Sequence, residues 1–179
     1  MADSRAPLTF ALFPEVPLFT LTSTDITEGE MLSQTQVADS MGYHGDNRSP
    51  HLSWSGFPPE TKGFAVTLHD PDAPTGSGFW HWLVVNIPAD VTELSSGAGA
   101  VDTTSLPTGA FQLRNDGGTR GYVGSAPPPG DIPHRYVHTV HALDVDHLDV
   151  DVTSSPAMAG FNLRFHAIAR AQVVAVFGS

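Results

Sequence analysis

Residues 68–88 read LHDPDAPTGSGFWHWLVVNIP, and they set the type of fold. Two apolar runs of strand length flank a turn that prolines stiffen, because proline fixes φ and keeps the preceding residue extended. Asp70 and Asp72 stand in that turn, and His81 opens the second run between two tryptophans. A stiff turn that holds two acids beside a histidine predicts one wall of a small polar pocket.

The composition is that of one folded domain built mostly from strands. The chain has 179 residues, of which 40% are hydrophobic and 15% charged, which is enough apolar material to bury a core. Its 17 glycines and 15 prolines favour many short elements joined by turns. We therefore expect a single domain over residues 1–179, in which residues 1–15 form a loose N-terminal arm.

The charge excludes several classes of partner. A formal net charge of −11 repels nucleic acid and anionic membrane surfaces, and no cluster of lysine and arginine offsets that repulsion. No run approaches the roughly 18 apolar residues that a membrane-spanning helix needs. Residues 1–22 lack the basic and apolar regions of a signal peptide. We expect a soluble, cytoplasmic protein.

The pattern of apolar residues predicts six strands and one helix. Short runs rich in β-branched and aromatic residues, bounded by turn residues, are typical of strands. The predicted strands span residues 18–23, 52–54, 63–69, 82–87, 134–143 and 171–177. Met158, Phe161, Phe165 and Ile168 follow helical spacing, with Pro156 near the start, and predict one amphipathic helix.

Polar side chains occur at the predicted strand ends, next to loops rich in proline or glycine. Strands that end at one rim of a sheet bring such loops together, so we expect three segments to form one pocket. We expect His81 and His134 to supply N–H donors and Tyr136 to supply a hydroxyl. Backbone N–H groups near Ser125 and Ala126 would complete an anion-sized cavity.

The two acids need a separate role, because a carboxylate repels an anion. A carboxylate that is hydrogen bonded to one imidazole nitrogen fixes the tautomer of the ring and favours its charged form. We assign this orienting role to Asp70 and make Asp72 a pocket wall or a turn cap. A plainer alternative is that both acids cap the turn through Asx bonds and that His81 is a core histidine.

Other chemistries find no motif in this sequence. There is no Gly-x-Ser-x-Gly elbow, no phosphate-binding loop and no His-Glu-x-x-His, and the His and Asp residues are too far apart in sequence to predict a metal site. The absence of cysteine excludes disulfides, thiolate metal sites and cysteine nucleophiles. We expect no metal and no cofactor.

Three motifs in order resemble the phosphatidylethanolamine-binding protein family, in its bacterial Raf-kinase-inhibitor-like branch. They are DPDAP at 70–74, WHWLVVNIP at 80–88, and GYVG, PPPG and HRY within 121–136. The likeness extends from Phe19 to Phe177. It implies a mainly β fold, a β-sandwich of antiparallel-rich sheets with a few short peripheral helices.

The same resemblance implies a small cavity that binds phosphate-like or carboxylate anions. The pocket residues of the family fall on Asp70, Asp72, His81, Pro127, His134 and Tyr136. One departure is Ala126, where most relatives have glycine or proline before the paired prolines. Its methyl group either narrows the rim of the pocket or points away from it.

We therefore expect a non-catalytic binding or regulatory protein with a pocket for phosphate, a phosphoryl headgroup or a carboxylate. The candidate ligand-binding residues are Asp70, Asp72, His81, Ser125, Ala126, Pro127, His134 and Tyr136. Two alternatives stay open: a hydrolase that uses a His–Asp pair as general base on water, and a protease or kinase inhibitor that acts through surface loops. The resemblance adds a regulated protein partner and a homodimer to these expectations.

Overall fold

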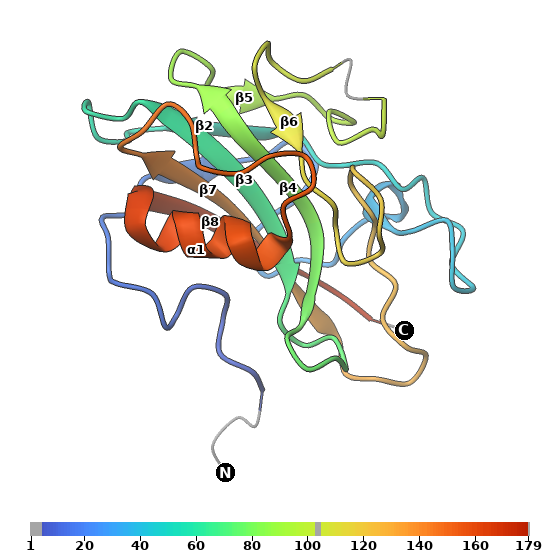
Figure 1. Ribbon diagram of the computed structural model, residues 1–179. Helices are drawn as coiled ribbons and strands as arrows, with labels where there is room; N and C mark the ends of the chain where they lie inside the picture. Colours follow the sequence, from blue (N-terminus) through green and yellow to red (C-terminus); the bar gives the residue numbers. More distant parts are fainter. Residues whose placement is uncertain (1–4, 103–104, 179) are drawn as a thin grey trace.

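Within the part of the chain that the structure describes, two β-sheets and one α-helix form the fold (Figure 1). The structure, a computed structural model, describes residues 5–102 and 105–178. The smaller sheet contains β1 (Thr20–Thr22), β2 (Leu52–Ser55) and β5 (Glu93–Leu94) in the order β1-β2-β5. The larger sheet contains β3 (Gly63–Asp70), β4 (Phe79–Pro88), β6 (Phe111–Gln112), β7 (His134–Leu143) and β8 (Ala167–Phe177) in the order β6-β4-β3-β7-β8. The paired strands of both sheets are antiparallel, and the remaining elements are the 3-10 turn η1 (Gln34–Gln36) and helix α1 (Pro156–His166).

The larger core fills the space between the two sheets. Trp54 of β2 packs edge to face on Phe64 of β3, with ring centroids 5.4 Å apart. Phe64, Val66 and Leu68 occupy alternate positions of β3, so all three side chains point into this core. Every residue of β3 is buried because the opposite face of the strand is covered as well. The mainly β fold predicted from the sequence is therefore confirmed.

The second core lies between the larger sheet and α1, which crosses the outer face of that sheet (Figure 1). Leu83 of β4 belongs to the same cluster as Ala159 and Leu163 of α1. The helix begins after Ser155, whose hydroxyl oxygen accepts the backbone N–H of Met158 at 3.2 Å. This cap satisfies one of the N–H groups that the first helical turn leaves without an intrahelical partner.

The predicted helix is present, but its apolar spacing does not mark the buried face. Met158, Phe161 and Phe165 are all exposed, Phe161 to 61%, and Ile168 belongs to β8, which follows α1 directly. Leu163 and smaller residues face the sheet instead, which lets the helix approach it closely. Phe161 and Phe165 pack against each other on the outside, with ring centroids 5.1 Å apart.

The predicted strands match the observed ones most closely where they are long. β3 and β7 lie where they were expected, while β4 begins three residues earlier and β8 four residues earlier than the apolar runs indicated. β5 and β6 were not predicted, because a strand of two residues has no measurable period.

The described part of the N-terminal arm, residues 5–15, has neither helix nor strand and runs beside α1 (Figure 1). Phe10 and Phe13 pack edge to face, with centroids 5.0 Å apart, and both contact the second core. The Thr9 hydroxyl lies 2.8 Å from His69 Nδ1. These contacts place the segment against the outer face of the larger sheet.

Candidate ligand-binding site

A cavity of about 210 Å³ lies at the end of the larger sheet where β3 ends and β7 begins. Four segments distant in sequence form it: residues 40–41, residues 70–81 around the hairpin after β3, residues 123–128 and the start of β7. Six of the eight predicted ligand-binding residues line it: Asp70, His81, Ala126, Pro127, His134 and Tyr136. Asp72 and Ser125 lie outside the lining.

Asp70 and His134 form a buried pair on this wall. Asp70 Oδ2 lies 2.7 Å from His134 Nδ1, and both side chains are almost fully buried. Asp70 Oδ1 accepts the backbone N–H groups of Asp72 at 2.8 Å and Ala73 at 3.0 Å, so the carboxylate also caps the turn. Burial raises the pKa of Asp70, and the hydrogen bond from His134 opposes that rise. The carboxylate thereby fixes Nδ1 of His134 as a donor and directs Nε2 away from the pair.

A second acid, Asp131, lies at the other nitrogen of the same ring. Its Oδ2 is 3.3 Å from His134 Nε2, and its side chain is partly exposed. The backbone N–H of Ile132, and then His134, lower the pKa of Asp131. Sequence reasoning missed this residue, since Asp131 stands in an irregular loop and its place three residues before His134 was the available signal.

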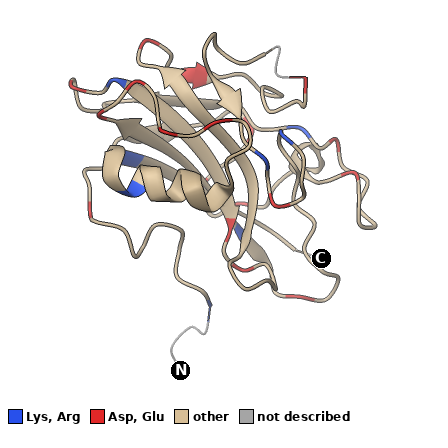
Figure 2. Cartoon of the chain, viewed as in Figure 1, with Lys and Arg blue, Asp and Glu red and all other residues tan. Residues whose placement is uncertain are grey.

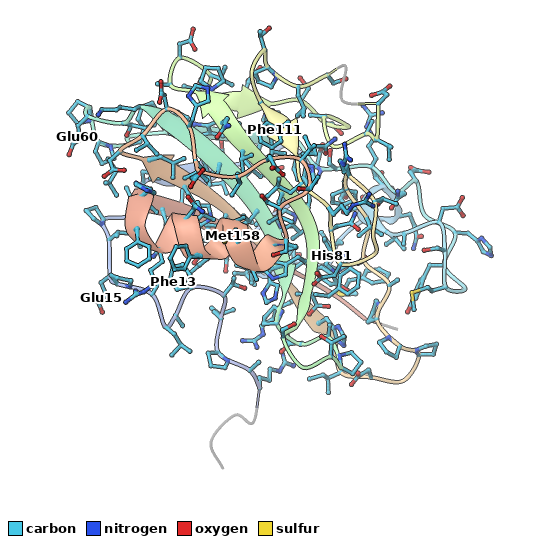
Figure 3. All side chains as sticks on the ribbon, viewed as in Figure 1. Phe13, Glu15, Glu60, His81, Phe111 and Met158 are labelled. Carbon is cyan, nitrogen blue, oxygen red and sulfur yellow. The ribbon has the colours of Figure 1, made fainter. Side chains whose placement is uncertain are left out.

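His81 projects from β4 toward the cavity (labelled in Figure 3). Its Nδ1 lies 2.8 Å from the carbonyl oxygen of Val123, which can only accept a hydrogen bond, so Nδ1 carries a proton. Burial lowers the pKa of His81 to about 4. Nδ1 is thus engaged by Val123 and leaves Nε2 as the other polar atom of the ring, and the role of His81 as an N–H donor to a ligand stays a prediction.

Tyr136 supplies the one hydroxyl among the predicted cavity-lining residues. Its ring packs edge to face on His81, with centroids 5.3 Å apart. Burial, and then the nearby Asp70 carboxylate, raise the pKa of Tyr136, so the hydroxyl keeps its proton. Its oxygen is buried and finds no hydrogen-bond partner among the described residues, although the Ala126 amide is close. A buried hydroxyl without a partner is suited to bind a ligand atom.

The two predicted residues outside the lining have other contacts. Burial would raise the pKa of Asp72, but the hydrogen bonds from Arg135 outweigh it and hold that pKa below its ordinary value. Those bonds run from Nε and Nη2 of Arg135, each 2.7 Å from a carboxylate oxygen. The Ser125 N–H donates to the Gln36 carbonyl oxygen at 3.2 Å, so this amide is not free to bind an anion.

The remaining lining residues come mainly from loops. Sequence reasoning missed Ser40, Met41, Thr75, Phe79 and Val123, among others. Loop residues carry no periodic signal, so their placement depends on tertiary contacts. One such contact is the Tyr43 hydroxyl, which donates to the Pro127 carbonyl oxygen at 2.8 Å and joins two walls of the cavity.

The cavity has no permanent cation, because neither lysine nor arginine is among the described residues that line it. The chain has only eight such residues, and Figure 2 shows them scattered among more numerous acids. Positive charge at the cavity must therefore come from histidine. Over residues 5–102 and 105–178 no three His, Asp or Glu residues are grouped closely enough to hold a metal ion. No helix in the same ranges is both long and apolar enough to span a membrane.

Comparison with known proteins matches this architecture. The sequence is 52% identical to the UPF0098 protein YbhB of Escherichia coli over 157 residues, which cover 88% of this chain and 98% of YbhB. The crystal structure of E. coli YbcL superposes with a TM-score of 0.88 at 51% identity, covering 90% of this chain and 98% of YbcL. The homolog CT736 of Chlamydia trachomatis superposes with a TM-score of 0.74 at 27% identity, covering 90% of this chain and 98% of CT736.

The family comparison covers almost the whole chain. The phosphatidylethanolamine-binding protein family matches residues 22–178, a range that contains both sheets except for two residues of β1. The match includes each segment that lines the cavity. This chain belongs to the phosphatidylethanolamine-binding protein family.

Proposed function

We propose that this chain is a non-catalytic binding protein whose cavity takes a small phosphate- or carboxylate-type anion. The observation that carries the proposal is the His134 ring, held by the buried Asp70 carboxylate in a cavity that Tyr136 also lines, with a hydroxyl that has no partner among the described residues. One ring and one hydroxyl then face a single ligand. Membership of a family of binding proteins supports the binding role.

A bound anion and a proton on the His134 ring stabilise each other. In the neutral ring, Nδ1–H donates to Asp70, so Nε2 of His134 becomes a donor only when the ring is protonated. An anion at Nε2 stabilises that imidazolium, and the Asp70 carboxylate stabilises it from the other side. In the bound state the imidazolium of His134 therefore lies between the anion and the Asp70 carboxylate. The Asp131 side chain must turn away from Nε2 to make room for the anion.

The shape of the cavity limits the ligand to a small group. A volume of about 210 Å³ accommodates a phosphate or carboxylate with a few attached atoms. Phe79, Pro127 and Pro128 provide apolar walls, which suit a short hydrocarbon substituent. Phosphate, phosphoethanolamine and acetate are the probes that fit these dimensions.

Isothermal titration with these three probes tests the proposal. Tyr136→Phe removes only the hydroxyl and should weaken binding by about tenfold, the value of one hydrogen bond to a charged group. Tyr122→Phe is the matched control, because the Tyr122 hydroxyl is also buried but donates to the Gln36 carbonyl oxygen outside the cavity. His134→Ala should abolish binding. Wild-type affinity in both cavity variants would overturn the proposed site.

A further inference from the structure

Arg170 of β8 is a buried cation without a counter-charge. The residue is 6% exposed, and none of the carboxylates in the described ranges lies within ion-pair distance of it. Among the described residues, only Nη1 of its three guanidinium nitrogens has a hydrogen-bond partner, the Pro14 carbonyl oxygen at 3.3 Å. Nε is fully buried and has no partner among the described residues. Most of its five N–H groups are therefore unused.

The contacts that surround Arg170 do not replace an anion. Its Cζ lies 5.3 Å from the ring centroids of both Phe10 and Phe13, so the charge has aromatic faces beside it. Aromatic faces attract the cation but supply no acceptor for its in-plane N–H groups. His141, the register partner of Arg170 on β7, also has a buried nitrogen, Nδ1, without a partner among the described residues. Buried polar atoms of this kind are suited to bind a polar group of a ligand.

A cavity of about 440 Å³ opens beside this cation, between residues 8–18 and β8. Its walls are mostly apolar, with Leu8, Phe13, Val16 and Leu18 among them, and Arg170 and Gln172 form its polar side. It shares no lining residue with the cavity at His134. Figure 3 shows Phe13 and Glu15 on the N-terminal segment, well away from His81. We call this second cavity the Arg170 groove.

We propose that the Arg170 groove binds an amphipathic monocarboxylate, whose carboxylate pairs with the Arg170 guanidinium and whose acyl chain lies against Leu8, Val16 and Leu18. A guanidinium with free N–H groups matches the two oxygens of a carboxylate. The apolar walls suit a hydrocarbon chain. Glu15 also lines the groove, and its charge disfavours a dianion such as a phosphate monoester.

Backbone geometry keeps the groove in place. The Arg170 N–H donates to the Pro17 carbonyl oxygen, and the Phe19 N–H donates to the Arg170 carbonyl oxygen, both at 3.0 Å. Leu18 lies between these two bonds with its side chain 80% exposed, so one side of the groove stays open to solvent. A chain can therefore enter without breaking the attachment of the segment to β8.

The test is titration of the full chain with sodium octanoate, followed by amide chemical shifts in two-dimensional NMR. Octanoate should move the signals of residues 8–18 and 170–172. Octanol, which lacks the carboxylate, and acetate, which lacks the chain, should each bind at least about tenfold more weakly. Octanoate shifts confined to residues 123–136 would place the ligand in the other cavity and overturn the proposal.

Variants then separate binding at Arg170 from general effects of charge. Arg170→Gln should weaken octanoate binding by about tenfold or more. Arg164→Gln should leave it within about twofold, because Arg164 lies on α1, 5.9 Å from the same Phe13 ring, and does not line the groove. Equal affinity in the two variants would overturn the proposal.

A second pair of variants avoids any change in the buried cation. Leu18→Asp places a negative charge at the open side of the groove and should weaken octanoate binding severalfold without disturbing the core. Leu12→Asp is the matched control, because Leu12 is 87% exposed on the same segment but does not line the groove. This pair decides the matter if Arg170→Gln does not fold, and equal octanoate binding by the two variants would contradict the groove. Either result leaves the proposal for the His134 cavity untouched.

Discussion

His134 Nδ1 lies 2.7 Å from Asp70 Oδ2, joining the first residue of β7 to the last residue of β3. A salt bridge between Asp72 and Arg135 lies beside this pair. The first pair lines the cavity and the second does not. Arg135 Nη2 also donates to the Ala6 carbonyl oxygen at 2.7 Å, so the second pair contacts the N-terminal segment. The pair proposed to bind a ligand and the pair that supports the structure thus belong to neighbouring residues.

Asp70→Asn should reduce anion affinity by about tenfold or more. The amide keeps the shape and the turn-capping oxygen, but it removes the negative charge that stabilises a protonated His134 ring. Because burial raises the pKa of Asp70, its ionisation costs stability that is lost progressively as pH rises from the ordinary pKa of an aspartate through the raised pKa of the folded state. The free energy of unfolding at pH 7 should therefore change by less than about 2 kcal/mol. Titration calorimetry and urea unfolding measure the two effects.

Asp72→Asn should show the reverse pattern. The pKa of Asp72 lies below its ordinary value because of Arg135, so its charge supports the folded state above about pH 4. Losing the charge should lower the free energy of unfolding by about 1–3 kcal/mol and leave anion affinity unchanged. An affinity loss in Asp72→Asn as large as that in Asp70→Asn would show that the two pairs are not separate.

Asp131→Asn should strengthen anion binding. Asp131 Oδ2 lies 3.3 Å from His134 Nε2, the atom to which an anion would bind, so the carboxylate competes with the ligand. The asparagine variant removes that competing charge, and phosphate affinity should rise severalfold. Asp146→Asn is the matched control, because exposed Asp146 also pairs with a histidine, His147, but lies outside the cavity. Weaker phosphate binding in Asp131→Asn would mean that the acid helps to hold the ligand.

Regular strands made the cavity residues predictable. The period of two along β7 puts His134 and Tyr136 on one face, and the parity of β3 puts Asp70 on the same core side as Leu68. Asp72 has the same parity in sequence, yet it follows Pro71 in the turn, where strand parity no longer applies. Its direction is set by Arg135, which the sequence did not indicate.

Other features depend on tertiary contacts that leave no local pattern. Val123, distant in sequence, accepts the hydrogen bond from Nδ1 of His81, and no local pattern indicated this contact. The helical spacing of Phe161 and Phe165 is real, but the smaller face of α1 packs on the sheet. The cation at Arg170 was equally hidden, since its burial results from Phe10 and Phe13, which lie far away in sequence.

Acid should destabilise the fold between about pH 6.5 and pH 4 through buried neutral histidines. Burial lowers the pKa of both His81 and His138 to about 4 from an ordinary value of 6.5. A depressed folded-state pKa supplies stability that is complete above the unfolded value and is lost as pH falls toward the folded value. Each ring accounts for about 3 kcal/mol of this loss. Urea unfolding over this pH range measures it.

His138→Gln isolates one of these rings, because His138 does not line the cavity. Below about pH 6.5 the free energy of unfolding should fall with decreasing pH less steeply in the variant than in the wild type. The difference in slope should be about 1.4 kcal/mol per pH unit, the value for one proton bound on unfolding. Identical slopes for His138→Gln and the wild type would mean that His138 does not titrate on unfolding in this range.

Gly124→Ala should disrupt both stability and the cavity. A Cβ at residue 124 would lie 2.5 Å from the Val37 carbonyl carbon and 2.6 Å from the Gln36 carbonyl oxygen, so backbone would have to move. Residues 123–126 form a wall of the cavity, and their displacement should weaken phosphate binding. We expect a loss of at least about 2 kcal/mol in the free energy of unfolding.

Gly160→Ala is the control for that substitution. A Cβ at Gly160 in α1 meets nothing within 4 Å, so alanine should raise the free energy of unfolding by about 0.5–1 kcal/mol through its better helix propensity. Phosphate binding should not change, because α1 contributes no residue to the cavity at His134. Because residue 124 lies in close contact with residues 36–38 and residue 160 has open space, replacing glycine with alanine should lower the free energy of unfolding at residue 124 and raise it at residue 160. Equal free energies of unfolding for the two variants would show that the backbone around residue 124 accommodates a Cβ without loss of stability.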